Sequence, residues 1–340
     1  MASQDTRPSV SDVDGTLLNQ QKQVKPETNS VGLLGVQIES LVLALESLTD
    51  GDLAVDVLIA CGKRAIAPLE NLLLYGKPRT IAIPRCRAAR ALGGLEARGT
   101  LLAYFEKVGL PRDPAVLFAE DAVRSMVAHE LMRWREEDVF QSLLRAARQR
   151  ATLGLVEALG EFRRSEAVPL LFETLEDDLC RDAASTALCG TPDESRQYAI
   201  LTVRQGTQTN LRGPAALRRR RGAAELFRKF GISSEEWKHV SQLLEDEDPT
   251  VVICVASAGL HVAPQEEFPG IILALFRVAH KLNWLQEDAI IHLLDEHKAL
   301  AHSVARQILA DLRAHGERVN WLSSTWRILG HLEQFDPKKD

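Results

Sequence analysis

The residues with the clearest chemical potential are two acidic side chains near the N-terminus, Asp12 and Asp14, which are followed by Gly15 and Thr16. Two carboxylates at this spacing can reach one phosphate group and one Mg²⁺ ion, because hard cations prefer oxygen ligands. One of the carboxylates can also act as a nucleophile that accepts a phosphoryl group. The chemistry that this pair would support is metal-dependent phosphoryl transfer.

The segment around the pair, Ser11–Asn19, resembles the first motif of haloacid-dehalogenase-type phosphatases. The resemblance implies that Asp12 would be the phosphoryl-accepting nucleophile and Asp14 the general acid–base, and that both would help to hold Mg²⁺. Two later segments look like further motifs of that family. Leu58–Gly62 is similar to its second motif, and Gly51–Asp56 is similar to its acidic fourth motif.

Three features depart from the pattern of that family. The residues before the pair, Ser3–Ser9, are polar and include a proline, whereas the nucleophile of the family ends a buried strand. Cys61 stands where the second motif needs Ser or Thr, and the acidic segment precedes that motif instead of following it. Residues 1–60 also cannot supply the several βα units of a Rossmann-like domain. We therefore favour a protein without enzyme activity, with Asp12 and Asp14 as the only catalytic candidates.

A second group of residues is basic and could bind anions. Four consecutive arginines at a predicted helix start could grip phosphates or an acidic protein surface, and they could equally form a solvated helix face. The group comprises Arg212, Arg218, Arg219, Arg220, Arg221, Arg228 and Lys229. The formal net charge of −6 and the pI of about 5.9 argue against a general nucleic-acid binder, which is usually basic.

The histidines and cysteines do not predict a metal site. His292, His297 and His302 are five residues apart, so successive side chains on a helix point in different directions. One His-Glu pair is present, His129-Glu130, whereas the HEAT-type hydroxylases that bind iron carry several. The five cysteines are scattered and none belongs to a CxxC pair, which is typical of reduced thiols in a cytosol. We expect neither a metal nor a cofactor.

The elements that must position these residues are predicted to be helices. From Val31 onward apolar residues recur at three- and four-residue spacing, which indicates amphipathic helices. Within this part of the chain a unit repeats: a Leu-rich helix, an acidic turn, and a second helix with paired small residues. The centres of the second helices are Ala89, Val123, Val156, Ala184, Ala224 and Ala256, which lie 28 to 40 residues apart.

The repeated unit resembles HEAT repeats of the phycobilisome-lyase-like subtype, most clearly at residues 65–93, 166–190 and 240–260. The resemblance covers about residues 50–315 and implies an all-α fold, an α-solenoid of about seven to nine helix pairs. It also implies that first helices line the convex face and second helices line the concave face. Proteins of this superfamily serve as scaffolds, adaptors, lyase subunits or glycosylases.

Composition and turn residues divide the chain into five predicted parts. They are a flexible polar tail at 1–30, an N-terminal array at 31–203, an irregular loop at 204–217, a C-terminal array at 218–335 and a short tail at 336–340. The longest nearly apolar run, Val251–Ala263, is too short to span a bilayer. We expect a cytoplasmic protein that does not enter a membrane.

The predicted function is a protein-interaction scaffold or adaptor that binds a partner protein on the concave face of a HEAT solenoid. Three enzyme alternatives stay open: a phycobilin-lyase-like protein, a HEAT-like DNA glycosylase, and a Mg²⁺-dependent phosphatase that uses Asp12 and Asp14. A nucleic-acid binder that uses Arg218–Arg221 is the remaining alternative. The sequence does not identify the partner or the oligomeric state.

Overall fold

A computed structural model describes residues 30–209, 213–314 and 323–333. These residues form helices α1 to α18 with short 3-10 or π turns between some of them, and they contain no strand. The prediction of an all-α chain is therefore confirmed. Within the same ranges no helix is both long enough and apolar enough to cross a bilayer.

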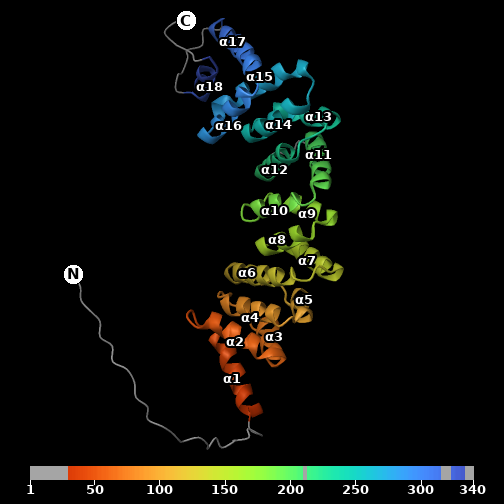
Figure 1. The fold of residues 1–340 in the computed structure, drawn as a ribbon, viewed down its shortest axis with the longest axis vertical. Coiled ribbons are helices and arrows are strands. Elements are labelled where there is room, and N and C mark those ends of the chain that lie inside the picture. The colour runs from red at the N-terminus through yellow and green to blue at the C-terminus, as the bar shows by residue number, and fades with distance from the viewer. Residues whose placement is uncertain (1–29, 210–212, 315–322, 334–340) are drawn as a thin grey trace, which may run out of the picture.

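The helices form an elongated stack in which each element packs mainly on elements near it in the chain (Figure 1). From α4 to α14 the even-numbered helices follow one side of the stack in Figure 1 and the odd-numbered helices follow the other side. The even-numbered helices are α2 (Gly51–Ala60), α4 (Ile83–Gly94), α6 (Pro114–Leu131), α8 (Leu153–Phe162), α10 (Arg181–Leu188), α12 (Pro214–Phe230), α14 (Pro249–Val262), α16 (Trp284–Asp295) and α18 (Ser324–Glu333).

The odd-numbered helices complete the pairs. They are α1 (Ser30–Ala44), α3 (Ile66–Glu70), α5 (Arg98–Lys107), α7 (Glu137–Gln149), α9 (Val168–Thr174), α11 (Pro192–Thr209), α13 (Ser234–Val240), α15 (Phe268–Val278) and α17 (Lys298–Ala314). The short turns are η1 (Gly62–Ala65), η2 (Asn71–Tyr75), η3 (Ser165–Ala167), η4 (Ser241–Glu245), η5 (Gln265–Glu267) and η6 (Ala279–Lys281).

Small residues let the even-numbered helices approach one another closely. The predicted centres all lie on even-numbered helices and are fully buried: Ala89, Val123, Val156, Ala184, Ala224 and Ala256. At Gly160 of α8, an added Cβ would lie 2.6 Å from Cβ of Ala187 on α10, and at Gly154 it would lie 2.4 Å from the Ser125 carbonyl oxygen on α6. Glycine and alanine therefore allow α6, α8 and α10 to pack closely against one another.

Two helices begin at acidic caps, and one of these, Asp248, belongs to an acidic turn of the predicted repeat, whereas the turn at Asp177 and Asp178 makes no side-chain cap on α10. Asp113 caps α6, where its Oδ1 accepts hydrogen bonds from the amides of Ala115 at 2.9 Å and Val116 at 3.0 Å. Asp248 caps α14 by accepting from the amide of Val251 at 3.3 Å. Both acids precede a proline at the first helical position, which lacks the N–H that would otherwise stay unsatisfied there.

The core also contains a buried polar cluster between α4, α5 and α6. The Glu120 carboxylate accepts a hydrogen bond from the Tyr104 hydroxyl and forms an ion pair with Arg85, and all three side chains are buried. Nη2 of Arg85 also donates to the Leu73 carbonyl at 2.9 Å. Burial, followed by the charge of Glu120, raises the pKa of Tyr104, so its hydroxyl remains a hydrogen-bond donor.

The predicted irregular loop at 204–217 is wrong for most of its length. Helix α11 continues to Thr209, and α12 begins at Pro214 after Gly213, so only residues 210–212 lie outside the described residues. The prediction gave too much weight to Gly206 and to the run of Thr, Gln and Asn. An isolated glycine costs a helix only about 1 kcal/mol, and neighbouring helices can offset that cost.

The stack does change its packing at this point. Helix α12 packs on α9, α11 and α14, whereas extensive contacts between consecutive even-numbered helices join α2 through α10 and then α12 through α18. A gap between α10 and α12 is visible in Figure 1. We call this place, where α10 and α12 have few contacts, the joint.

Candidate partner-binding groove

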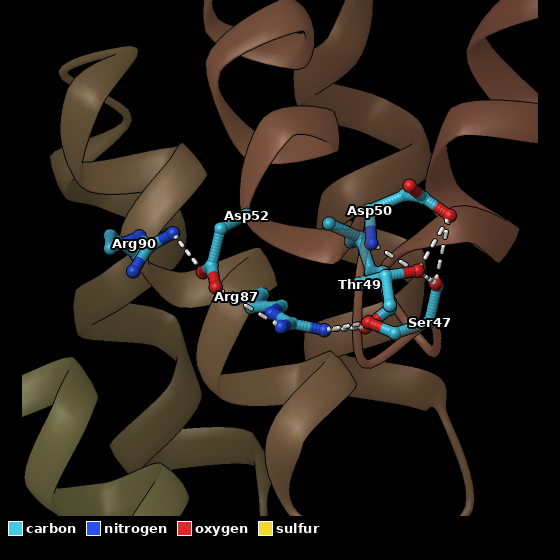
Figure 2. Close-up of polar contacts among 7 residues, drawn as sticks. Ser47, Thr49, Asp50, Asp52, Arg87 and Arg90 are labelled. Atoms are coloured by element: carbon cyan, nitrogen blue, oxygen red, sulfur yellow. Dashed lines mark hydrogen bonds and ion pairs between the residues drawn. The ribbon is translucent and has the colours of Figure 1, made fainter.

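The proposed catalytic carboxylates, Asp12 and Asp14, lie outside the described residues, as does Arg212 of the basic group. The two segments similar to later phosphatase motifs lie at helix α2 and the turn after it, not around a phosphate site. Figure 2 shows Asp52, the acidic residue of one of these segments, between two arginine side chains of α4.

The contacts of Asp52 are structural. Its carboxylate lies 3.2 Å from Nη2 of Arg87 and 2.5 Å from Nη2 of Arg90 (Figure 2). Nη1 of Arg87 also donates to the carbonyls of Leu45 at 2.8 Å and Ser47 at 2.5 Å. Hydrogen bonds from Arg87 and then Arg90 hold the pKa of Asp52 below its ordinary value. These residues join α4 to α2 and to the end of α1.

The basic group at the start of α12 is ion-paired, in a way that the sequence did not predict. Two arginines reach back toward the acidic turn between α9 and α10: Nε of Arg219 lies 2.8 Å from Oε1 of Glu176, and Nε of Arg218 lies 3.7 Å from Oδ1 of Asp178. These contacts cross the joint at which α10 and α12 pack little on each other.

Two further arginines reach forward to the acidic turn before α14. Nε of Arg220 donates to Oδ2 of Asp246 at 2.7 Å, and Nε of Arg221 donates to Oδ1 of Asp248 at 3.0 Å. We call Arg218–Arg221 and their acidic partners the arginine clasp. Because each guanidinium already has a carboxylate partner, the clasp favours the structural interpretation of these arginines over binding of an external phosphate.

The other two basic residues of the group also face protein atoms. Nζ of Lys229 donates to the Ser185 hydroxyl at 2.8 Å, which links α12 to α10. The positive charge of Arg228 lies near the Cys254 thiol and opposes the rise in its pKa that burial causes. The acidic turns before α10 and before α14 therefore both receive arginines of α12, and the turn before α14 also caps that helix through Asp248.

The predicted histidine positions do not converge. Nε2 of His331 lies 3.0 Å from Asp295, and Nε2 of His292 lies 3.6 Å from Asp288, four residues earlier on the same helix. Over the ranges that the structure describes, no three His, Cys, Asp or Glu side chains are placed to hold one metal ion. All five cysteines are free thiols.

A groove of about 740 Å³ lies between α8 and α10. Its floor contains small residues, Gly160, Ala183, Ala187 and Gly190. This floor follows from the close helix approach, since Gly160 and Ala187 are where the two helices meet. The volume lies within the range of about 300–1,000 Å³ that is typical of ligand pockets.

One end of the groove is apolar and exposed. It is lined by Leu153, the first residue of α8, and by Leu179, two residues before α10, which are 46% and 77% exposed. Contact of large apolar side chains with water is unfavourable. A partner that covers these two leucines would therefore gain binding free energy.

The middle of the groove is acidic. Glu157 and Glu161 lie one turn apart on α8, and Asp182, the second residue of α10, also lines the groove. Glu161 forms an ion pair with Arg135 at 2.9 Å. Glu157 and Asp182 form no ion pair within the described residues, and Arg163, at the end of α8, is the one basic side chain among the described residues that line the groove.

The groove also contains an accessible thiol. Cys189 lines its far end and is exposed, and its Sγ donates to the Ser185 carbonyl at 3.1 Å. By contrast, burial raises the pKa of Cys86, Cys180 and Cys254 to about 11, so those thiols stay protonated near neutral pH. Cys189 is therefore a natural reporter for this surface.

The sequence contains a signal for the groove that the motifs above do not include. Leu153, Glu157 and Glu161 recur every four residues on the side of α8 opposite its buried stripe. Residues in such a pattern normally face solvent. They form one wall of a groove here because residues of α10 line the other side.

Comparison of the chain with models of known protein families and with curated proteins finds no match. The exposed surfaces of the fold are therefore the basis for a functional proposal.

Proposed function

We propose that the chain is a protein-interaction scaffold, an α-solenoid of HEAT-like helix pairs that binds a partner protein along its even-numbered helices. The observation that carries this proposal is the groove between α8 and α10, which combines exposed leucines with charged side chains in one concavity. Protein interfaces commonly combine apolar anchors with charged and polar side chains.

The exposed leucines belong to a longer series. Even-numbered helices in this part of the stack run in the same direction, since Arg85 contacts Glu120 near the start of α4 and α6. Near those starts α4 exposes Ile83 and α6 exposes Phe118, which is 73% exposed. We call Ile83, Phe118, Leu153 and Leu179 the apolar edge. A line of anchors that recurs from unit to unit suits an extended partner.

The scaffold proposal explains the molecule better than its alternatives. The arginine clasp uses the basic side chains that a nucleic-acid binder or a glycosylase would need. The free state of all five cysteines supports the further proposal that the protein works in a reducing compartment such as the cytoplasm.

The test is quantitative capture of partners from the organism's own extract. The double substitution Leu153→Glu/Leu179→Glu places charges at the apolar end of the groove and is expected to reduce the amount of each specific partner about tenfold or more, because central apolar anchors contribute about 2 kcal/mol or more. The readout is label-free mass spectrometry of proteins eluted from immobilised full-length chain.

A matched control uses leucines on odd-numbered helices. Leu201 on α11 and Leu273 on α15 are similarly exposed, at 51% and 53%. The variant Leu201→Glu/Leu273→Glu should retain its partners. Equal loss in the two double variants, or no loss in either, would show that the proposed face is not the binding face.

A further inference from the structure

The groove between α8 and α10 contains two features that together specify an occupant. Its apolar end, formed by Leu153 and Leu179, can receive one aliphatic or aromatic side chain. Its middle offers the carboxylates of Glu157 and Asp182, which have no cationic partner in the part of the chain that the structure describes. An occupant that matches both must be apolar at one position and basic a few residues away.

We infer that this groove binds a basic segment of the partner protein, in which one apolar side chain is followed by lysine or arginine residues. The inference rests on the proposed scaffold function and specifies the chemistry of its partner. Charge complementarity of this kind raises association rates and excludes acidic competitors more than it adds affinity. The formal net charge of −6 of the whole chain acts in the same direction.

The arrangement of the lining favours this occupant over two others. A purely apolar segment would desolvate Glu157 and Asp182 without compensation, which is costly for charged groups. An acidic segment would meet three carboxylates before it reached Arg163 at the end of α8. A basic segment satisfies the middle of the groove and leaves Arg163 free to meet a backbone carbonyl.

The dimensions suit a short extended segment. Leu179 and Cys189 flank helix α10, whose 8 residues rise about 12 Å. Five residues of extended chain cover about 16 Å. A hexapeptide with leucine at one end and cysteine at the other can therefore place its central side chains beside Glu157 and Asp182.

The experiment is equilibrium disulfide exchange at Cys189, which detects weak binding at one defined place. The probes are acetyl-Leu-Gly-Lys-Lys-Gly-Cys-amide and two versions in which Gln-Gln or Glu-Glu replaces Lys-Lys. Each is incubated with the full-length chain in a buffered thiol–disulfide mixture, and the mixed disulfide at Cys189 is measured by intact mass and peptide mapping. The variant Cys189→Ser supplies the background.

We expect the Lys-Lys peptide to form about fivefold more mixed disulfide than the Glu-Glu peptide, with the Gln-Gln peptide between them, since each exposed ion pair makes a small favourable contribution to binding. Glu157→Gln/Asp182→Asn should reduce this preference to less than about twofold. The control variant Glu245→Gln/Glu266→Gln changes the net charge equally at another surface groove and should keep the preference.

Three results would overturn the inference: equal labelling by all three peptides, strongest labelling by the Gln-Gln or Glu-Glu peptide, or equal loss of preference in both double variants. The last result would show that net charge alone attracts the lysines. Such a failure is distinguishable from failure of the scaffold proposal, because partner capture that still depends on Leu153 and Leu179 would leave the scaffold proposal standing with a differently charged partner.

Discussion

Replacing Glu120 with glutamine is expected to lower the free energy of unfolding by about 3–5 kcal/mol, which is typical when one member of a buried ion pair is removed. The substitution keeps the size of the side chain but leaves Arg85 as an uncompensated charge, and both side chains are almost completely buried. Tyr104 also loses a charged hydrogen-bond acceptor. Urea unfolding followed by circular dichroism measures the change.

Two control variants test whether the loss of stability comes from the buried charge and not from a Glu→Gln substitution as such. Glu245→Gln changes an exposed carboxylate and should shift stability by less than about 0.5 kcal/mol. The double variant Arg85→Met/Glu120→Met removes both charges and should recover much of the loss, because hydrophobic replacements of buried ion pairs are often tolerated. A loss below about 1 kcal/mol for Glu120→Gln would contradict the assignment of this cluster to the core.

Replacing Asp248 with alanine is expected to destabilise the C-terminal part of the stack by about 2 kcal/mol, the upper end of the range for loss of a helix N-cap. The carboxylate caps α14 and also binds Arg221 of the clasp. Hydrogen exchange should therefore accelerate in α12 and α14 and change little in α4 to α8. In a stack of helices, stabilising contacts are made mainly between neighbours, so the loss stays local.

The same substitution has a defined pH dependence. Burial by itself would raise the pKa of Asp248, but hydrogen bonds and charge from Arg221 outweigh it, so the pKa lies below the ordinary value of 3.8. A lowered folded-state pKa means that this stabilisation is present above pH 3.8 and is lost as the pH falls through the folded-state pKa. The stability difference between the wild type and Asp248→Ala should therefore shrink as the pH falls below about 4.

Asp246→Asn is the matched comparison for the clasp. It weakens the ion pair with Arg220 but leaves the cap of α14 intact. A smaller loss, about 1 kcal/mol or less, is expected because Arg220 is partly exposed to solvent. If Asp246→Asn and Asp248→Ala had equal effects at every pH, the cap would not be the main contribution of Asp248.

Local patterns in the sequence predicted much of the fold. The paired small residues, such as Ala184 and Ala256, identified the helices that pack most closely, because close approach requires small side chains wherever it occurs. The acid-proline step at Asp248 identified a helix start for a reason confined to a few neighbouring residues. The loop predicted at 204–217 failed because packing on α9, α12 and α13 supports α11 as a helix despite residues that disfavour one.

Local sequence patterns did not predict the interactions between different helix pairs. Arg219 and Glu176 are 43 residues apart, and nothing local indicates that they form a pair. The groove could not be predicted for the same reason. Leu153 and Leu179 belong to different helix pairs, and each alone resembles an ordinary exposed leucine. A candidate binding surface of this kind becomes visible only when neighbouring units are placed beside each other.

The most direct test of the proposed binding face is the alkylation rate of Cys189 in the purified complex with a captured partner. The complex and the isolated chain are treated with iodoacetamide, and peptide mapping follows modification of this one exposed thiol over time. With the partner at about ten times its dissociation constant, the groove should be occupied in about nine molecules of ten, so alkylation should slow about tenfold. An unchanged rate at the same occupancy would show that the partner binds elsewhere and would contradict the account.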